Sequence, residues 1–476
     1  MKKKTWLHVL ESCVFVALAC VMLAGATRML ERKASRNQFG PFLDNPQQYD
    51  VIFLGDSHFV NSMFPMELWE DYGIAGYNLA CYGNTMPVNY WAMMNALDYA
   101  SPKVVVVAVN GVQRDFKVTG SSSDLHTALD FYPLSLTKAK AIEDLMDDPD
   151  AQDDDGNRYV DMKWEYYFTL GKYHSRWNEI SMSDFVGNPN VQKGALMMLG
   201  VAPAQEYDII EADRYGEETG VGYSYLRRII EECRAREIEV LLVHLPYQAT
   251  EEAQMSANTV GGIAEEYDVN YIDFVQMDSV VDYATDCFDQ HAHLNPSGGW
   301  KVTDFLGQYL HERYALADHR NEPAYASWHR ASEAYRESVR DLIRSQNDLA
   351  NLLVMLHGDS VSGAVAIGEG ADFYWDERLI TLLHNAQREH VYDADAYSMW
   401  SNSMYPLDGL EDAIASDEAY FLLLDRESGV RSEYVGTEAI EQAEQYFGKS
   451  VLKAGKEVRI RLQDNLTGEV LSDRQF

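Results

Sequence analysis

The sequence predicts an α/β protein whose central domain is a doubly wound parallel sheet, with an N-terminal transmembrane helix before it and a C-terminal α+β domain after it. Short, unbroken apolar runs alternate with helical patterns through the middle of the chain, which is typical of a parallel sheet buried on both faces. An apolar stretch near the N-terminus is long enough to cross a bilayer. Beyond residue 319 the alternation is replaced by one long helical stretch and hairpin-like strand pairs.

The composition excludes some classes of protein. The chain has 476 residues, 46% of them hydrophobic, so it can bury a large core and form more than one domain. Its 39 Lys and Arg against 75 Asp and Glu give a net charge of −36, which would repel a nucleic-acid backbone. Five cysteines without CxxC spacing predict neither a structural zinc site nor a scaffold of disulfides.

The N-terminal segment, residues 1–34, is predicted to be a signal anchor. Residues 7–26 form a run of 20 residues with Glu11 as the one charge, about the length that spans a bilayer. A signal peptide cleaved after Ala24-Gly25-Ala26 remains the alternative. Basic residues flank the run on both sides, so the positive-inside rule does not set the orientation. With the N-terminus inside by default, the chain is expected to be a single-pass protein of the cell membrane with an extracytoplasmic body.

A polar linker, residues 35–48, leads into an α/β domain expected over residues 49–318. Its apolar runs predict five strands, and the patterns between them predict helices. The expected strands are 50–55, 75–80, 103–110, 237–246 and 269–274, and the expected helices include 62–72, 89–99 and 222–236.

The strand rhythm stops between residues 115 and 220, which predicts an insertion above the carboxyl edge of the sheet. Its acidic run 147–156 fails the EF-hand pattern, because Ala151 and Met162 stand where calcium ligands are needed, so a solvated acidic loop is expected. Its aromatic residues either pack the insertion or line an acceptor site for a sugar. They are Trp164, Tyr166, Tyr167, Tyr173 and Trp177.

The remaining residues, 319–476, predict an α+β accessory domain of unknown role. A helix is expected over 322–356, then a strand over 363–367 and a helix over 376–386. Two hairpins are expected over 420–434 and 457–476, the second turning at Asn465-Leu466-Thr467-Gly468.

Two motifs carry the chemistry. Gly55-Asp56-Ser57-His58 joins an apolar strand to a helix, a turn that exposes a serine nucleophile at the carboxyl edge of the sheet. Near the end of the domain, Asn295-Pro296 predicts a helix start, so His293 lies in the loop before it. A histidine there, with a carboxylate a few residues earlier, is placed to act as a base.

Further residues fall at the same edge. Gly83 follows the second expected strand, where its amide could face a developing oxyanion, and Asn110 ends the third, where its side chain could donate to the same oxygen. His58 is expected to line the site, because adjacent residues on a tight turn point apart. His291 and His293 with Asp286 and Asp289 could instead hold a metal, but no third ligand motif accompanies them, so neither a metal nor a cofactor is predicted.

These residues resemble the SGNH (GDSL-like) hydrolase superfamily over about residues 48–315. The strings VIFLGDSHFVNSMFPMELWEDYGIAGYNLACYGNT, PKVVVVAVNG and HLNPSGGWKVTDFLGQYL are similar to a membrane-anchored branch that includes the D-alanyl transfer protein of teichoic-acid modification and alginate-type O-acetyltransferases. The resemblance implies a flavodoxin-like sheet of SGNH type. It also implies Ser57 as nucleophile, His293 as general base and Asp289 as its orienter. The oxyanion hole would be the amides of Ser57 and Gly83 with the Asn110 side chain.

The chain departs from the superfamily pattern in two places. The superfamily places its aspartate three residues before the histidine, where this chain has Gln290, so Asp289, four residues before, and Asp286 are both candidates for the orienter. The anchored branch often has GSSH where this chain has Asp56. Cys81 and Cys287 lie close in sequence to the site residues and could pair outside the cytoplasm, although Cys233 makes the number odd.

The predicted function is therefore a membrane-anchored, extracytoplasmic serine esterase or O-acyltransferase acting on a cell-surface polysaccharide or wall polymer through an acyl-serine. Hydrolysis and transfer share that intermediate, and the sequence does not separate them. The anchored branch also implies a membrane acyl-transfer partner protein. The rival hypothesis is a non-catalytic anchored scaffold of the envelope.

Overall fold

The central sheet of the computed structural model has five parallel strands in the order β2-β1-β3-β4-β5. The structure describes residues 2–31, 39–186, 190–277, 280–386, 389–392, 400–403, 407–449 and 457–476. The strands are β1 (Val51–Leu54), β2 (Gly76–Asn78), β3 (Val104–Ala108), β4 (Glu239–His244) and β5 (Asn270–Asp273). All five predicted strands are confirmed, each shorter than the apolar run that predicted it.

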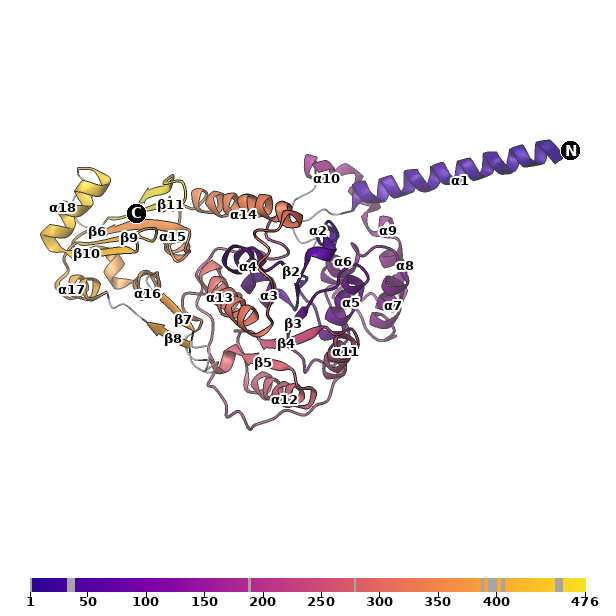
Figure 1. Cartoon of the computed structure of the whole chain (residues 1–476), viewed down its shortest axis with the longest axis horizontal. Coiled ribbons are helices and arrows are strands. Elements are labelled where there is room, and N and C mark those ends of the chain that lie inside the picture. Colours follow the sequence, from indigo (N-terminus) through magenta and orange to yellow (C-terminus); the bar gives the residue numbers. More distant parts are fainter. Residues whose placement is uncertain are drawn as a thin grey trace.

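Both faces of this sheet are buried, which explains the unbroken apolar runs. In β1, Val51 and Phe53 belong to the core on one face, whereas Ile52 and Leu54 belong to the core on the other. Helices α3 and α13 cover the first face, and α5, α11 and α12 cover the second (Figure 1). Their bounds are α3 (Ser57–Ser62), α13 (Pro296–Arg313), α5 (Met86–Leu97), α11 (Val221–Ala235) and α12 (Glu251–Tyr267). The predicted parallel α/β sheet is confirmed.

Strand order determines where a ligand can bind. The chain runs from β1 outward to β2 on one side and to β3 on the other, so the crevice between the carboxyl ends of β1 and β3 is the topological switch point where open α/β sheets bind ligands. Ser57 follows β1 and Asn110 follows β3, which places both residues at that crevice.

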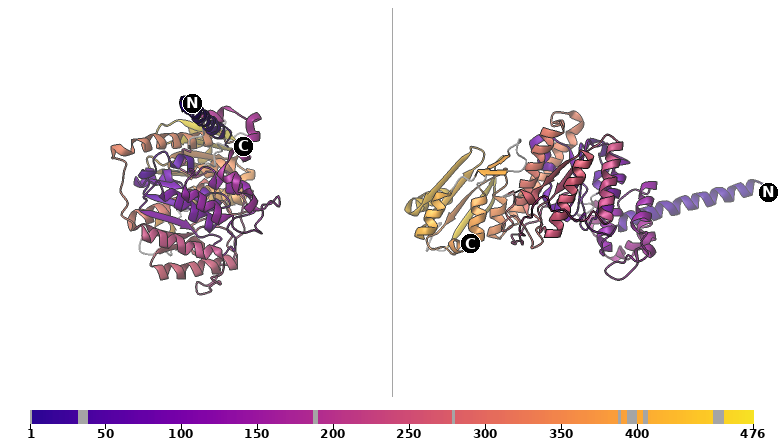
Figure 2. Two further views of the ribbon diagram at one scale, coloured as in Figure 1. Left: turned by 90° about the vertical axis from the view of Figure 1, so that its right-hand side faces the viewer. Right: turned by 90° about the horizontal axis from the view of Figure 1, so that it is seen from below.

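The N-terminal helix α1 (Lys2–Leu30) projects away from the body (Figures 1 and 2). Within it, residues 8–30 are apolar enough, with a mean hydropathy of 2.2, and long enough to cross a membrane. Most of that span is exposed, and burial begins in its last turn, where Leu30 is covered by the body. The evidence that α1 spans a membrane is its length and its apolar composition.

The insertion lies above the carboxyl edge only in part, which corrects the sequence expectation. Its helices are α6 (Ser122–Leu129), α7 (Leu136–Leu145), α8 (Tyr159–Tyr167), α9 (Leu170–Tyr173), η2 (His174–Asn178) and α10 (Met182–Val186). They pack against α5 and against the end of α1. The extended segment that follows is the part that crosses the edge, where Lys193 O accepts from Asn78 N and Leu196 N donates to Val60 O.

The aromatic residues of the insertion divide between packing and exposure. Tyr166 is buried and stacks on His126, with 3.9 Å between ring centroids. Tyr173 donates to Asp130, and Tyr167 donates to Glu143. Trp164 on α8 and Trp177 on η2 are exposed; η2 contacts α1, and α8 contacts α9.

The C-terminal region builds a second, antiparallel sheet in the order β10-β9-β6-β11-β12. Both predicted hairpins are confirmed, and β6 lies between them. The strands are β6 (Val361–Ile367), β9 (Tyr420–Asp425), β10 (Val430–Val435), β11 (Val458–Asp464) and β12 (Val470–Gln475). A separate pair, β7 (Glu389–Tyr392) and β8 (Trp400–Ser403), is antiparallel. The helices are α15 (Leu349–Met355), α16 (Glu377–Asn385), α17 (Asp408–Ser416) and α18 (Gly436–Phe447).

The expected helix over 322–356 is wrong as one element. Helix α14 (Ala326–Arg344) ends before Ser345-Gln346-Asn347-Asp348, and α15 begins at Leu349 with the Asp348 side chain accepting from Asn351 N. Short polar side chains bond to nearby backbone groups and so favour helix ends over helix interiors.

Two further helices of the body, α2 (Phe39–Phe42) and α4 (Pro65–Tyr72), lie before and after β1 in the sequence.

A buried polar cluster joins the two sheets' domains beneath the loop that follows β5. Lys301 Nζ donates to Asp286 at 2.5 Å, Ser297 Oγ donates to the other Asp286 oxygen at 2.7 Å, and both charged side chains are almost fully buried. Ser297 also contacts His357, whose Nε2 bonds Leu382 O on α16. Burial lowers the pKa of His357 to about 3, so its ring is neutral at physiological pH.

Removing one member of this ion pair should destabilise the fold. Lys301→Met leaves the Asp286 carboxylate buried without its cation, which costs about 3–5 kcal/mol. The matched control is Lys163→Met, which breaks the exposed 2.7 Å pair with Glu143 and should change stability by about 1 kcal/mol or less. Thermal unfolding of the full chain in detergent, followed by circular dichroism, compares them. Equal midpoints for the two variants would contradict this assignment.

Candidate active site

Ser57 is the first residue of α3, directly after the turn that leaves β1. Asp56 caps the helix by accepting from His58 N at 3.0 Å. A Cβ at Gly55 would stand 2.9 Å from the Cβ atoms of Ala108 and Phe59, so only glycine allows this close approach of the turn to β3. The Gly-Asp-Ser sequence therefore holds Ser57 at the switch point of the sheet.

His293 is carried by a closed loop between β5 and α13. Cys287 and Leu294 form a β-bridge, and Phe288 N donates to His293 O at 2.9 Å, which closes the loop at its base. Asn295 begins α13 as its N-cap, accepting from Gly298 N, with Pro296 at the first helical position. The predicted helix start and the placement of His293 just before it are confirmed.

The structure brings three of the predicted residues into one hydrogen-bonded chain. Ser57 Oγ and His293 Nε2 are 2.7 Å apart, and His293 Nδ1 and Asp289 Oδ2 are 2.8 Å apart. An ionised carboxylate can only accept, so Asp289 requires the proton on Nδ1. That tautomer leaves the Nε2 lone pair facing the Ser57 hydroxyl.

Asp289 also organises the loop that carries its partner. Its second oxygen, Oδ1, accepts from the backbone amides of His291 and His293 at 3.0 and 3.2 Å. The four-residue spacing from Asp289 to His293 is accommodated by Ala292, whose φ of 60° lies in the left-handed region. Asp286, the other candidate for the orienter, instead belongs to the buried cluster with Lys301.

The protonation states suit a base at neutral pH. Burial, the largest influence on the Asp289 carboxyl, opposes ionisation, but the His293 hydrogen bond and charge and the two backbone amides outweigh it and lower the pKa. For His293, burial and the nearby charge of His58 lower the pKa below its ordinary value of 6.5, against the opposing effect of Asp289. His293 is therefore neutral at pH 7.

His58 lines the site, as the sequence indicated, and is held by its own partners. Its ring stacks on that of His293, with 4.5 Å between centroids and 20° between planes. Its Nδ1 is 3.3 Å from Asp56 Oδ1, and its Nε2 is 3.2 Å from His291 O. Burial opposes protonation of His58, but the Asp56 charge and hydrogen bonds prevail and raise its pKa, while Asp56 has its pKa lowered in return.

Gly83 and Asn110 lie at the carboxyl edge where the sequence placed them. Gly83 follows β2 in a turn with φ of 71°, a left-handed conformation that favours glycine. The Asn110 side chain pairs with the backbone of Leu245, just past β4: Oδ1 accepts from Leu245 N at 3.0 Å and Nδ2 donates to Leu245 O at 3.3 Å. An amide nitrogen carries two hydrogens, so this pairing engages one of them.

Residues that the sequence reasoning did not use also approach the site. Tyr247, after β4, packs edge-on against His58 at 5.5 Å, and His244 at the end of β4 bonds Asp273 at the end of β5 at 2.7 Å. Arg114 lies close enough for its charge to lower the pKa of Asp56. His244 and Asp273 could have been predicted as site residues, because the carboxyl ends of parallel strands meet at one edge of the sheet.

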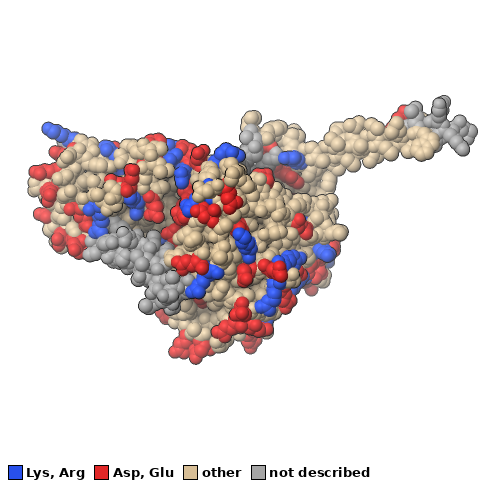
Figure 3. All heavy atoms as spheres, viewed as in Figure 1, with Lys and Arg blue, Asp and Glu red and all other residues tan. Residues whose placement is uncertain are grey.

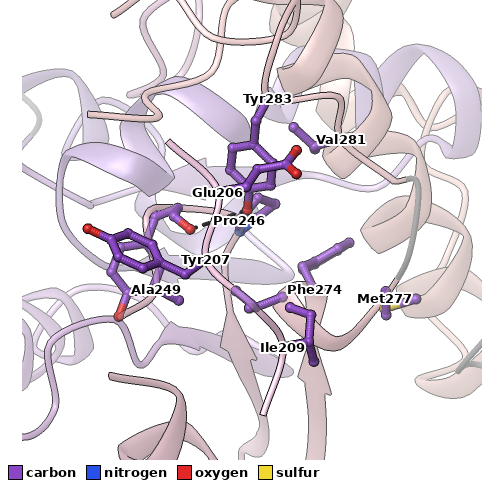
Figure 4. Close-up of a pocket in the computed structure, with 11 residues that line it drawn as sticks. Glu206, Tyr207, Ile209, Pro246, Ala249, Phe274, Met277, Val281 and Tyr283 are labelled. Atoms are coloured by element: carbon purple, nitrogen blue, oxygen red, sulfur yellow. Dashed lines mark hydrogen bonds between the residues drawn. The ribbon is translucent and has the colours of Figure 1, made fainter. Parts of the chain in front are cut away.

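A cavity of about 180 Å³ adjoins Tyr247 (Figure 4). It is bounded by the end of β4, by the residues after β5 and by the extended segment of the insertion, with Tyr283 donating to Tyr247 O. The lining residues are Glu206, Tyr207, Ile209, Pro246, Tyr247, Ala249, Phe274, Val275, Met277, Val281 and Tyr283. Most of these residues are apolar or aromatic, but polar atoms make up the larger part of the surface that they expose to the cavity.

The cysteines do not pair. The five described cysteines form no disulfide, and Cys81, Cys233 and Cys287 are buried, so the considered Cys81–Cys287 disulfide is absent. Over the described ranges, no group of three or more His, Cys, Asp or Glu side chains has metal-binding geometry.

Comparison with known proteins gives little guidance. No family model matches the chain, and no curated protein matches it. Among solved structures, the chain is similar to one named as a putative acylhydrolase from Bacteroides fragilis, with 11% sequence identity over 58% of this chain and 95% of that one. The TM-score is 0.29, so this likeness carries no argument about fold or function.

The stacked His58 ring should tune the titration of His293. His58→Gln removes a neighbouring positive charge and a ring that excludes water, so the pKa of His293 should rise toward 6.5. Diethyl pyrocarbonate modifies neutral imidazole, and tandem mass spectrometry of the His293 peptide across pH reports the midpoint. His174→Gln, in the insertion, is the control that should leave it unchanged. An unchanged or lower midpoint in His58→Gln would refute the coupling.

Proposed function

We propose that this chain is a serine acyl-enzyme, a divergent member of the SGNH hydrolases, anchored in a membrane and acting as an esterase or O-acyltransferase. The observation that carries the proposal is the chain of two short hydrogen bonds from Ser57 through His293 to Asp289. The parallel strand order 2-1-3-4-5 is the flavodoxin-like order. It supports the SGNH assignment because it brings the GDS turn and the histidine loop to one edge.

The first half-reaction forms the acyl-enzyme. As Ser57 Oγ attacks the carbonyl carbon of an acyl ester, its proton passes to His293 Nε2, and the carbonyl oxygen becomes an oxyanion. Asp289 stabilises the resulting imidazolium through Nδ1. When the tetrahedral intermediate collapses, the bond to the leaving alcohol breaks, and His293 returns the proton to that alcohol.

The second half-reaction releases the acyl group. His293, neutral again, takes a proton from an acceptor hydroxyl, whose oxygen attacks the carbonyl carbon of acyl-Ser57. Collapse breaks the bond to Ser57 Oγ, which recovers its proton from His293. Water as the acceptor gives a carboxylic acid, whereas a sugar hydroxyl gives a new ester.

The oxyanion hole proposed for both steps consists of the backbone amides of Ser57 and Gly83 and the Asn110 side chain. Gly83 offers its amide from a turn where a Cβ would meet Asp124 at about 3.0 Å. The pairing with Leu245 holds Asn110 in one orientation, which reduces the reorganisation needed when the charge develops.

The proposed substrate is an acyl ester, O-acetyl in the first instance, on a cell-surface polysaccharide or wall polymer. The resemblance to the anchored acyltransferase branch supports this choice, as does the apolar N-terminal helix. Under this proposal the helix holds the body at the outer face of the cell membrane, near its polymer and near a membrane protein that supplies acyl groups.

Fluorophosphonate labelling tests the nucleophile. The reagent should label purified full chain at Ser57, and Ser57→Ala should abolish labelling. His293→Ala should slow labelling by roughly 10²–10⁴-fold because the general base is lost. Asp289→Ala should slow it by roughly 10²-fold or more, since Nδ1 loses its acceptor. In-gel fluorescence gives the rates.

Two variants separate catalysis from folding. Ser224→Ala removes an exposed serine of α11 and should label at the full rate. Asp289→Ala should still unfold cooperatively, at a somewhat lower melting temperature, because the loop loses the bonds from the His291 and His293 amides while the Asp286–Lys301 pair stays intact. Absence of labelling in a chain that melts cooperatively would sink the enzyme assignment and favour a non-catalytic scaffold.

Product analysis separates transfer from hydrolysis. Full chain is incubated with an activated acetyl ester and an acetyl-free oligosaccharide of the envelope, and mass spectrometry follows both possible products. Transfer predicts acetyl on sugar that depends on Ser57 and His293. Acetate released with no acetylated sugar, at saturating oligosaccharide, would remove the transferase claim and leave the esterase.

A further inference from the structure

Large apolar side chains are exposed on one part of the insertion, the α8–α10 segment (residues 159–186). They are Trp164 on α8, Phe168 after it, Trp177 on η2, and Met182 and Phe185 on α10, with exposed fractions from 41% to 74%. Exposed apolar residues scattered singly need no explanation, but a group of them marks an interaction surface.

This surface is attached to the end of α1. Thr169 Oγ1 donates to Glu31 Oε1 at 2.7 Å, and Arg176 donates to Leu30 O at 2.6 Å while pairing with Asp184 of α10 at 3.0 Å. Helices α9 and α10 and the η2 turn all contact α1. Polar contacts therefore fix the α8–α10 segment to the last turn of the N-terminal helix.

The position of those contacts along α1 determines the depth of the α8–α10 segment relative to the bilayer. The candidate span ends at Leu30, Arg28 lies in its last turn, and Glu31 follows it directly. Because the hydrocarbon layer ends where such a span ends, the residues that bond Leu30 and Glu31 lie at the depth of the lipid headgroups. Helices α8 and α9 lie on the side of the body from which α1 projects (Figures 1 and 2).

We propose that the α8–α10 segment docks on the outer surface of the same bilayer that α1 spans, with these five side chains inserted among the headgroups. The inference rests on the membrane anchoring in the proposed function. It adds a second attachment, which would stop the body from rotating freely about α1 and would give the active site a defined orientation to the membrane.

The chemistry of the surface fits the interfacial zone. Trp is an amphipathic side chain enriched at membrane interfaces, and Phe is common on the apolar face of helices that lie in the interface. Attraction between charges is a poor alternative, because residues 37–476 carry 32 basic against 73 acidic groups and would be repelled by anionic lipids. Docking through aromatic side chains needs no anionic lipid, which commits the proposal to binding on zwitterionic membranes.

Lipid crosslinking of the full chain tests the proposal. The protein is reconstituted in phosphatidylcholine vesicles that contain a phospholipid with a diazirine near the headgroup end of its acyl chain. After irradiation, peptide mapping locates the adducts. We expect adducts on α1 and on peptides carrying Trp164, Trp177 and Phe185, at low and high salt alike. Peptides carrying Trp375, which is 83% exposed in the C-terminal domain, should carry none.

Charge substitutions provide the matched comparison. Full chain with Trp177→Glu and Phe185→Glu together should lose adducts on the α8–α10 segment and keep them on α1, whereas Trp375→Glu should match the wild type. Circular dichroism melting checks that each variant is folded. Adducts on α1 without any on the α8–α10 segment would overturn docking and leave the anchor intact. Failure to label α1 itself would instead refute the membrane anchor, and docking with it.

Discussion

The buried ion pair between Asp286 and Lys301 supports the loop on which the proposed chemistry depends. Asp286 lies directly before the histidine loop, which the Cys287–Leu294 bridge closes. Its backbone oxygen accepts from the amide of Asn295, directly after that loop. Asp286 therefore connects the two ends of the loop at the start of α13. The same carboxylate binds Lys301 and Ser297 on that helix. Removing either partner would leave the other charge buried and unpaired, which would lower the free energy of unfolding by several kcal/mol. Through Ser297 and His357 the cluster also reaches the C-terminal domain, so that domain packs against the support of the active-site loop.

The sequence predicted those features of the fold that depend on interactions between residues close in sequence. Two-face burial produces unbroken apolar strands, and the N-cap of α13 follows from Asn295-Pro296, so the sheet and the position of His293 could be predicted. The role of Asp289 relative to Asp286 could not, because it depends on a left-handed backbone at Ala292. The alternation implied a helix between β4 and β5, but the bounds of α12 were not predicted, because Gly261-Gly262 lowers helix propensity and packing on the sheet overrides it. The position of β6 between the two hairpins could not be predicted, because β6 pairs with strands that are distant in sequence. The contact of the insertion with α1 could not be predicted either, because no sequence pattern indicates it.

The distribution of charge separates the two ends of the molecule. Seven of the basic and two of the acidic residues lie in residues 1–36, so the rest of the chain carries a net charge of −41. Figure 3 shows acidic side chains spread over the body, whereas the described part of α1 is almost free of charge. An anionic wall polymer would be repelled by such a body unless cations bridge the two, so recognition through sugar hydroxyls and the acyl group suits the proposed substrate better. The cavity beside Tyr247, where polar atoms lie among aromatic side chains, adjoins the tyrosine that packs against His58.

The central claim is that Ser57 takes an acyl group with help from His293. Mass spectrometry of the peptide that contains Ser57, after brief exposure of the full chain to an acetyl donor and quenching in acid, tests it directly. The account predicts an acetyl group on Ser57 in the wild type, and none on that peptide in His293→Ala over the same interval. An unmodified Ser57 peptide from folded wild-type protein, or equal acetylation in the two proteins, would contradict it.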